Sequence, residues 1–126
     1  MINFIDVESR NVVGIRMNGK ITDQEFDAVA ALLEKRMQEF PKVNVYVEVE
    51  SFGGMAPKTF IKDLRFGFDN LDRFDKEAVV TEKDWIQKIT PIADKIFDSI
   101  EVKTFSFDQK DEAKKWVRQS NVNQET

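Results

Sequence analysis

Between residues 43 and 50, apolar and polar positions alternate without interruption. Valine occupies every second position, and the residues between the valines are Asn44, Tyr46, Glu48 and Glu50. Because the side chains of a strand point alternately to its two faces, this pattern predicts a strand with all its valines on one face. A parallel strand covered on both faces usually has a continuous apolar run, so we expect the polar face of this sheet to be partly exposed to water.

A glycine turn and an amphipathic helix are predicted directly after this strand. The turn Ser51-Phe52-Gly53-Gly54 permits positive φ values and a close approach of the backbone. Pro57 suits the first turn of a helix, where its missing N–H group costs nothing. The apolar stripe of the helix contains Phe60, Ile61, Leu64, Phe68 and Leu71. Phe66 lies about 200° around the helix from Leu64, so we expect it to point outward.

Two strands and a capped helix are predicted before the central strand. Residues 2–8 and 12–18 alternate as strands do, and the short link between them favours an antiparallel hairpin. Thr22 and Glu25 have the spacing of a capping box, which begins a helix. Pro41 ends this helix. Its apolar stripe contains Phe26, Val29, Ala30, Leu33, Met37 and Phe40.

An interrupted helix is predicted after residues 76–81, which have the pattern of a short buried strand. The apolar stripe of this helix contains Trp85, Ile86, Ile89, Ala93, Ile96 and Phe97. Pro91 lies inside the stripe and removes one backbone donor, so the helix either kinks or restarts. We expect a restart, with Thr90 as its cap and Pro91 in its first turn.

A last strand and a last helix complete the chain. Residues 101–107 alternate as a strand, and Asp108 is suited to cap the helix that follows. The apolar stripe of this helix contains Ala113, Trp116 and Val117. Residues 119–126 are polar, and we expect them to form a frayed C-terminal tail.

The order of elements is therefore ββαβαβαβα, which predicts an α/β fold. We expect a five-stranded mixed sheet, mainly parallel, with right-handed crossovers and one antiparallel strand from the hairpin. The alternating valines place the helices mostly on one face of the sheet. Because no linker interrupts the pattern, residues 1–118 are predicted to form a single domain.

The composition excludes several kinds of site. The chain has no cysteine and no histidine, which removes thiolate nucleophiles, the commonest general base and the commonest metal ligand. Its formal net charge of −4 argues against a general affinity for nucleic acids or anionic membranes. No stretch has the length of a membrane span, and the N-terminus lacks the features of a signal peptide. We expect a cytoplasmic protein without a cofactor and without integral membrane association.

A series of short motifs is distributed over nearly the whole chain. Gly19-Lys20-Ile21-Thr22 precedes the first helix, and Phe52-Gly53 follows the central strand. The others are Asp63, Ala78-Val79-Val80, Trp85, Ala113 and Trp116. In order and spacing they resemble the SpoIIAA-like family of small, mostly uncharacterised bacterial proteins, which is related in fold to STAS domains and to the lipid-binding CRAL-TRIO domain. The resemblance implies a curved sheet with helices in a right-handed superhelix, and it implies no known reaction.

The chain departs from the STAS pattern at the site of phosphorylation. In STAS regulators of sigma-factor partner switching, an Asp-Ser pair at the start of the helix after the central strand carries the phosphorylated serine. The corresponding residues here are Gly54-Met55-Ala56-Pro57. Ser51 lies too early and Thr59 too late to replace that serine. The sequence therefore gives no support to a phospho-switch of this kind.

The central strand, turn and second helix form the candidate binding site. The free N–H groups at the start of the second helix favour a small anion or a carboxylate headgroup, although the glycines are also explained by the turn alone. The aromatic and methionine side chains near the carboxyl edge of the sheet predict a small apolar pocket or a partner-binding surface, or else ordinary core packing. The candidate residues are Ser51, Phe52, Gly53, Gly54, Met55, Phe60, Asp63, Phe66 and Trp85.

A cluster of acidic residues follows the second helix. Asp69, Asp72 and Asp75 are evenly spaced, but the glycine and the closing glutamate of a calcium loop are missing. Arg65 and Arg73 are near enough to neutralise the cluster. The pattern therefore indicates a salt-bridged surface and no metal site.

These patterns favour a non-catalytic binding or regulatory module that contacts a protein partner or a small apolar, lipid-like ligand. We expect self-association, with a dimer favoured, through the second helix and the exposed sheet face. The alternative is an enzyme that uses carboxylates alone, Asp63 with Glu48 or Glu50. Such an enzyme requires a carboxyl group whose pKa is raised by burial. A peripheral membrane protein would require a basic or amphipathic surface, which the sequence does not show.

Overall fold

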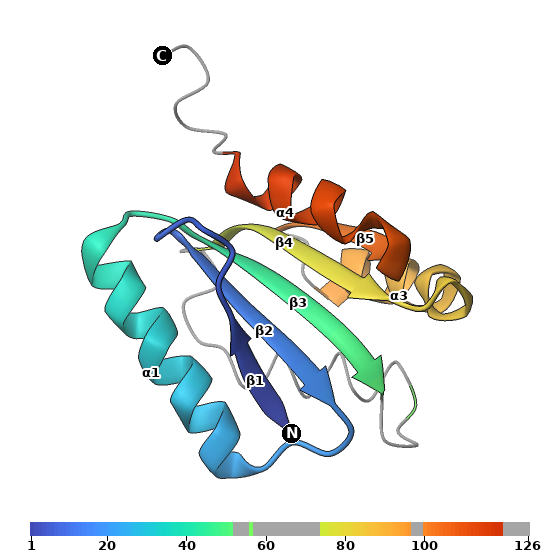
Figure 1. The fold of residues 1–126 in the computed structure, drawn as a ribbon, viewed down its shortest axis with the longest axis horizontal. Coiled ribbons are helices and arrows are strands. Elements are labelled where there is room, and N and C mark those ends of the chain that lie inside the picture. Colours follow the sequence, from blue (N-terminus) through green and yellow to red (C-terminus); the bar gives the residue numbers. More distant parts are fainter. Residues whose placement is uncertain (52–55, 57–73, 97–99, 120–126) are drawn as a thin grey trace.

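The computed structural model describes residues 1–51, 56, 74–96 and 100–119. Within them, five strands form one sheet in the order β1-β2-β3-β4-β5 (Figure 1). The strands are β1 (Ile2–Ile5), β2 (Val12–Asn18), β3 (Val43–Ser51), β4 (Phe74–Thr81) and β5 (Glu101–Ser106). β1 is antiparallel to β2, and the other neighbouring strands are parallel. The predicted mixed, mainly parallel sheet with its N-terminal hairpin is confirmed.

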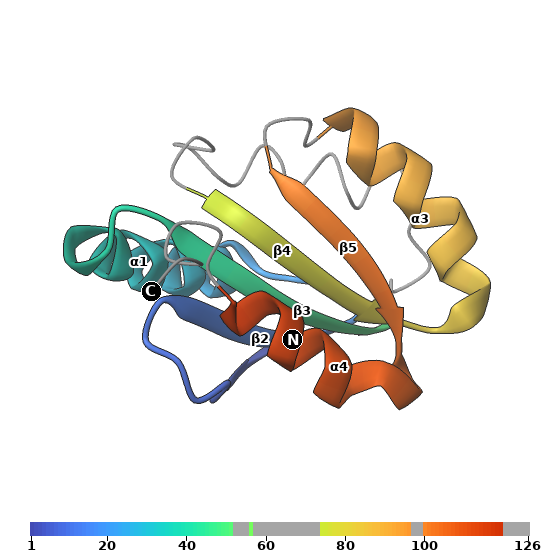
Figure 2. The same cartoon turned by 90° about the horizontal axis from the view of Figure 1, so that it is seen from above.

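Helices cover both faces of this sheet (Figure 2). α1 (Asp23–Glu39) and α3 (Lys83–Ile96) pack on the face that carries the valines of β3, which we call the valine face. α4 (Lys110–Arg118) packs on the opposite face. The core of the valine face includes Val29, Leu33 and Ile89 from the two helices. The helix predicted within residues 57–71 lies outside the described residues.

The polar side of β3 is buried, which corrects the prediction that this face is partly exposed to water. Asn44, Tyr46 and Glu48 are at most 2% exposed, and only Glu50 is open to solvent. The reason is α4, which no pattern within β3 could indicate. Self-association through an exposed face of β3 is therefore not available to this protein.

Burial of these polar groups is tolerated because they have hydrogen-bond partners. The side-chain amide of Asn44 donates to the carbonyl of Val117 in α4 at 2.7 Å. Its carbonyl oxygen accepts from the backbone N–H of Lys76 in β4 at 3.0 Å. Asn44 therefore connects β3 to both the neighbouring strand and the covering helix.

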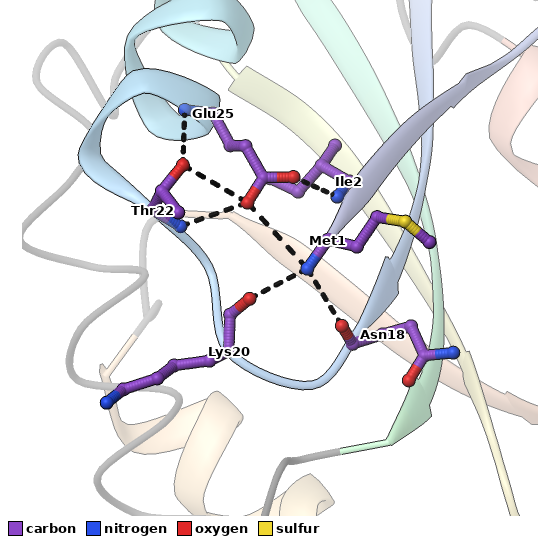
Figure 3. A network of polar contacts seen from close by, with 6 residues as sticks. All are labelled: Met1, Ile2, Asn18, Lys20, Thr22 and Glu25. Atoms are coloured by element: carbon purple, nitrogen blue, oxygen red, sulfur yellow. Dashed lines mark hydrogen bonds and ion pairs between the residues drawn. The ribbon is translucent and has the colours of Figure 1, made fainter.

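Polar contacts join the beginning of the chain to the beginning of α1 (Figure 3). The N–H of Glu25 donates to the hydroxyl of Thr22 at 3.1 Å, and the N–H of Thr22 donates to the Glu25 carboxylate at 3.0 Å, which confirms the capping box. The other carboxylate oxygen of Glu25 accepts from the N–H of Ile2 at 2.5 Å. The Met1 ammonium donates to two carbonyls of the β2–α1 turn at 2.7 and 2.8 Å. The hydrogen bonds from the backbone N–H groups of Thr22 and Ile2 lower the pKa of Glu25.

α3 is continuous through Pro91, so the predicted restart at Thr90 is wrong. The hydroxyl of Thr90 donates to the carbonyl of Ile86, one turn earlier, at 2.9 Å. It is also hydrogen-bonded to the hydroxyl of Thr104 on β5, at 2.9 Å. Because Ile89 is fully buried against the sheet, packing holds the helix together across the residue that lacks an N–H group.

The cap predicted at Asp108 is also wrong. A 3₁₀ turn, Phe107–Gln109, comes between β5 and α4, and Ser106 is its N-cap. The N–H of Ser106 donates to the side chain of Gln109 at 3.0 Å, and its hydroxyl donates to the Asp108 carboxylate. The predicted apolar stripe of α4 is confirmed, with Ala113 and Val117 buried and Trp116 half-buried.

Candidate functional site

Ser51 and Trp85 are the candidate binding residues that lie within the described part of the chain. The other candidates lie outside it: Phe52, Gly53, Gly54, Met55, Phe60, Asp63 and Phe66. Of the acidic cluster, Asp75 lies on β4 and is half-buried, whereas Asp69 and Asp72 are outside the described residues. The structure thus describes the surroundings of Ser51 and Trp85, the first and the last of the candidate residues in the chain.

Ser51 ends β3 at the carboxyl edge of the parallel strands and is half-buried. Its carbonyl oxygen accepts from the N–H of Gly19 at 3.0 Å, which joins β3 to the turn between β2 and α1. Gly19 has a φ of +70°, a conformation that favours glycine at this turn. The end of β3 is therefore connected on one side before the predicted glycine turn begins.

Trp85 lies in the first turn of α3, shortly after the end of β4. It is half-buried and packs against the core of the valine face. The Lys88 ammonium lies 5.1 Å from the centre of its ring, a cation–π contact on the solvent side. Trp85 thus has a packing role at the start of α3.

A cavity of about 300 Å³ opens at the carboxyl ends of β4 and β5. Its wall includes the apolar ring of Phe107 and four charged side chains, of which Glu82 and Asp84 are exposed acidic residues and the other two are paired with each other. Lys83 Nζ lies 3.8 Å from the carboxylate of Asp108, which also accepts from the hydroxyl of Ser106. These contacts hold the pKa of Asp108 below its ordinary value, with the Ser106 hydrogen bond as the main cause.

Four polar side chains meet on the α4 side of the sheet, and we call them the Glu48 cluster: Arg16, Tyr46, Glu48 and Lys110. The Tyr46 hydroxyl donates to Glu48 Oε2 at 2.7 Å, and Arg16 Nε donates to Glu48 Oε1 at 3.0 Å. Lys110 Nζ, at the start of α4, lies 3.5 Å from the same Oε1 atom. Both oxygens of the buried carboxylate therefore have partners, and three elements of the fold are joined at one point.

The Glu48 cluster stabilises the ionised carboxylate of Glu48 and the protonated forms of Tyr46 and Arg16. Burial opposes the ionisation of Glu48, but the hydrogen bonds from Tyr46 and Arg16 and the charge of Lys110 outweigh it and lower the pKa of Glu48. Burial and the neighbouring carboxylate raise the pKa of Tyr46. The same carboxylate raises the pKa of Arg16. The cluster is thus a stabilising ion network and is unsuited to proton transfer.

Glu77 has the opposite surroundings. It lies on the valine face of β4, beside Val45 of β3 and Val102 of β5 in the sheet register, and it is 9% exposed. No hydrogen bond or ion pair joins its carboxyl group to another described residue. Burial alone raises the pKa of Glu77 to about 7. At neutral pH this side chain is therefore divided between its protonated and ionised forms.

Neither Glu77 nor the Glu48 cluster is predicted as a site by the sequence patterns. The signal for Glu77 is an acidic residue next to Ala78-Val79-Val80, inside a strand that the pattern predicts to be buried. The signal for the cluster is weaker. Tyr46 and Glu48 share a face by alternation, but Arg16 joins them only through the parallel register of β2 with β3. No group of acidic residues in the described ranges is arranged to hold a metal ion.

Comparison with protein-family models matches residues 12–118 to a model described as SpoIIAA-like. This range contains every described element except β1. The search of curated proteins and the search of solved structures each found no match. Among the described helices, none combines the length and the apolar character that crossing a membrane requires.

Proposed function

Because the chain belongs to the SpoIIAA-like family, we propose that it is a non-catalytic binding or regulatory module. Domains of this family are typically of that kind. Its partner is another protein or a small apolar, lipid-like ligand, which it contacts around the central strand, turn and second helix. The contact residues are Ser51, Phe52, Gly53, Gly54, Met55, Phe60, Asp63, Phe66 and Trp85.

One observation carries this proposal, namely the composition of the carboxyl edge. Ligands of open α/β sheets bind at this edge, and here it has a cavity of about 300 Å³. Phe107 gives this cavity an apolar contact surface, Lys83 and Asp108 are paired with each other, and the exposed Glu82 and Asp84 complete the wall. The lowered pKa of Asp108 argues against a general acid here, and the Phe107 ring supports apolar contact.

The same region is proposed to mediate self-association, with a dimer as the favoured state. Since α4 covers the polar side of β3, that side is not available for self-association, and we expect the second helix to form the contact between the two copies. Phe66 is the residue on which this proposal depends, because the helical spacing turns it away from the apolar stripe.

Native mass spectrometry of protein purified under mild conditions without added ligand tests both parts of the proposal. We expect a dimer or a retained small molecule, and a spectrum of unliganded monomer alone would contradict the proposal. Phe66→Ser should abolish the additional species. The control is Ala31→Ser, at an exposed apolar position of α1 that lines neither of the cavities described for this protein, and it should leave the spectrum unchanged.

The alternative function, an enzyme that uses carboxylates alone, has one observation in its favour. The pKa of Glu77 is raised to about 7 by burial, as a general acid or base requires. Glu48, one of the two partners predicted for Asp63, is unsuited because its pKa is lowered. Measurement of the carboxyl pKa values by NMR tests this alternative, and ordinary values throughout the native protein would end it.

A further inference from the structure

A second cavity lies at the opposite end of the molecule from the carboxyl edge. It has a volume of about 540 Å³, within the range of small-ligand sites. Its walls come from β1, the turn between β1 and β2, the start of β2, and α1. Figure 1 shows why these segments meet: the turn and the C-terminal end of α1 lie at the same end of the sheet. The side chains that matter for its chemistry are Phe4, Arg10, Leu32 and Arg36.

Two guanidinium groups of this cavity share one carboxylate. Arg10 Nη2 lies 2.5 Å from Glu39 Oε1, and Arg36 Nη1 lies 3.5 Å from Glu39 Oε2. Two acidic residues, Asp6 and Glu8, also lie in the wall. Glu8 lies 3.7 Å from Arg118, and the carboxylate of Asp6 accepts from the backbone N–H of Glu8 at 2.8 Å. Each of the two guanidinium groups donates to Glu39 through one nitrogen, so both keep N–H donors for a further acceptor.

Arg36 also has a donor without an acceptor. Its Nε atom is buried and has no hydrogen-bond partner among the described residues. Buried donors of this kind are rare, because an unmade hydrogen bond is costly once water has been excluded. The planar fork of a guanidinium matches a carboxylate, so a ligand oxygen at Nε would supply the missing acceptor.

The remaining wall of the cavity is apolar. Phe4 on β1 is 51% exposed, and Leu32 on α1 is half-buried one turn before Arg36. An inorganic anion would leave these two side chains in contact with water, whereas an organic anion would cover them. The cavity thus combines two guanidinium groups with an apolar surface.

We propose that this cavity binds a small organic carboxylate with an apolar body. The carboxylate accepts from Arg36 and is attracted by Arg10, and the apolar body contacts Phe4 and Leu32. The proposal is independent of the function proposed for the carboxyl edge, because the two cavities share no residue.

Titration of the full chain with phenylacetate, followed by ¹H–¹⁵N NMR, tests the proposal. We expect shifts of the Arg36 Nε–H signal and of the backbone signals of Gly14 and Leu32, with the signals around Ser106 unchanged. Arg36→Gln should weaken binding about tenfold or more, since a hydrogen bond to a charged group is lost. Lys35→Gln removes the same charge from the adjacent exposed position of α1 and should change the affinity less than about twofold.

Two further measurements separate recognition of the ligand from general attraction of anions. Arg36→Lys keeps the charge but lacks the fork, so it should weaken binding nearly as much as Arg36→Gln does. Acetate, inorganic phosphate and the neutral phenylacetamide should each bind about tenfold more weakly than phenylacetate. Equal binding of any of these three probes, equal effects of the Lys35 and Arg36 variants, or an absence of shifts would overturn the proposal.

Discussion

Two glutamates on adjacent strands are buried to a similar extent, but their pKa values are shifted in opposite directions. Glu48 on β3 is 2% exposed and faces α4, and its pKa is lowered. Glu77 on β4 is 9% exposed and lies on the valine face, and its pKa is raised to about 7. Depth of burial therefore does not decide the protonation state of a carboxyl group in this protein.

The partners of each carboxyl group decide it. Glu48 accepts from Tyr46 and Arg16 and lies near Lys110, so its ionised form is stabilised by more than burial costs. Glu77 has no partner for its carboxyl group among the described residues, so burial acts alone. The polar face of β3 is thus a source of stability above acidic pH, whereas the valine face contains one group that opposes folding when it ionises.

The largest expected effect comes from Glu77→Gln. Because the folded-state pKa of Glu77 is above its ordinary value of 4.5, its contribution to stability is fully present below pH 4.5 and is lost as the pH rises through about 7. The difference in free energy of unfolding between the variant and the wild type should therefore change by about 3 kcal/mol in favour of the variant across this window. Urea unfolding at a series of pH values measures this change, and parallel pH profiles for the two proteins would contradict it.

Glu48→Gln should have a smaller effect of the opposite sign. It leaves Arg16 and Lys110 without their counter-charge and should lower the free energy of unfolding by about 2 kcal/mol at neutral pH, a value reduced by the partial exposure of both cations. Since the folded-state pKa of Glu48 is lowered, its stability is present above pH 4.5 and is lost as the pH falls through the folded value. The unfolding curves of wild type and variant should converge in acid, and a constant gap would contradict this assignment.

Tyr46→Phe removes one donor from the Glu48 cluster and keeps the buried ring. We expect a loss of about 1.5 kcal/mol, because a hydrogen bond to a buried carboxylate is lost. The NMR-measured pKa of Glu48 should rise in this variant and the pKa of Glu77 should not, since the two side chains lie on opposite faces of the sheet. A shift of both pKa values would show that the faces are coupled.

Thr22→Ala, the smallest expected effect, provides a reference outside both faces. It removes the N-cap of α1 and should cost about 1 kcal/mol. Thermal unfolding at pH 6 and pH 8 should give the same loss, since neither buried glutamate contacts this cap. A loss that varies with pH in this range would indicate that the pH dependence assigned to Glu77 has another source.

Much of the fold was predictable because local patterns agree with the tertiary structure. The capping box at Thr22, the hairpin and the valine alternation of β3 each depend on residues close together in the chain, and each is confirmed. The errors fall where a distant element intervenes. Pro91 does not end a helix that is packed on the sheet, and Ser106 replaces Asp108 as a cap where β5 turns into α4.

The candidate site at the carboxyl edge stays a prediction, because most of its residues lie outside the described part of the chain. The order of strands and helices locates the carboxyl edge, and Ser51 and Trp85 border it. The cavity containing Arg36 could not be predicted, since it joins α1 to the β1–β2 turn and contains no motif. Its distinguishing feature, a buried guanidinium nitrogen without an acceptor, exists only in three dimensions.

The sequence by itself determined the order of the elements, the face of β3 that carries the valines and the absence of histidine and cysteine chemistry. These follow from periodicity and composition, which are properties of neighbouring residues. Only the tertiary structure decided that α4 covers Tyr46 and Glu48, that Arg16 reaches this carboxylate, and that Glu77 has no such partner within the part of the chain that the structure describes. The physical reason is that the ionisation of a buried carboxyl group depends on the side chains that contact it. Those side chains come from segments that are distant in the sequence, so their positions are set by tertiary packing.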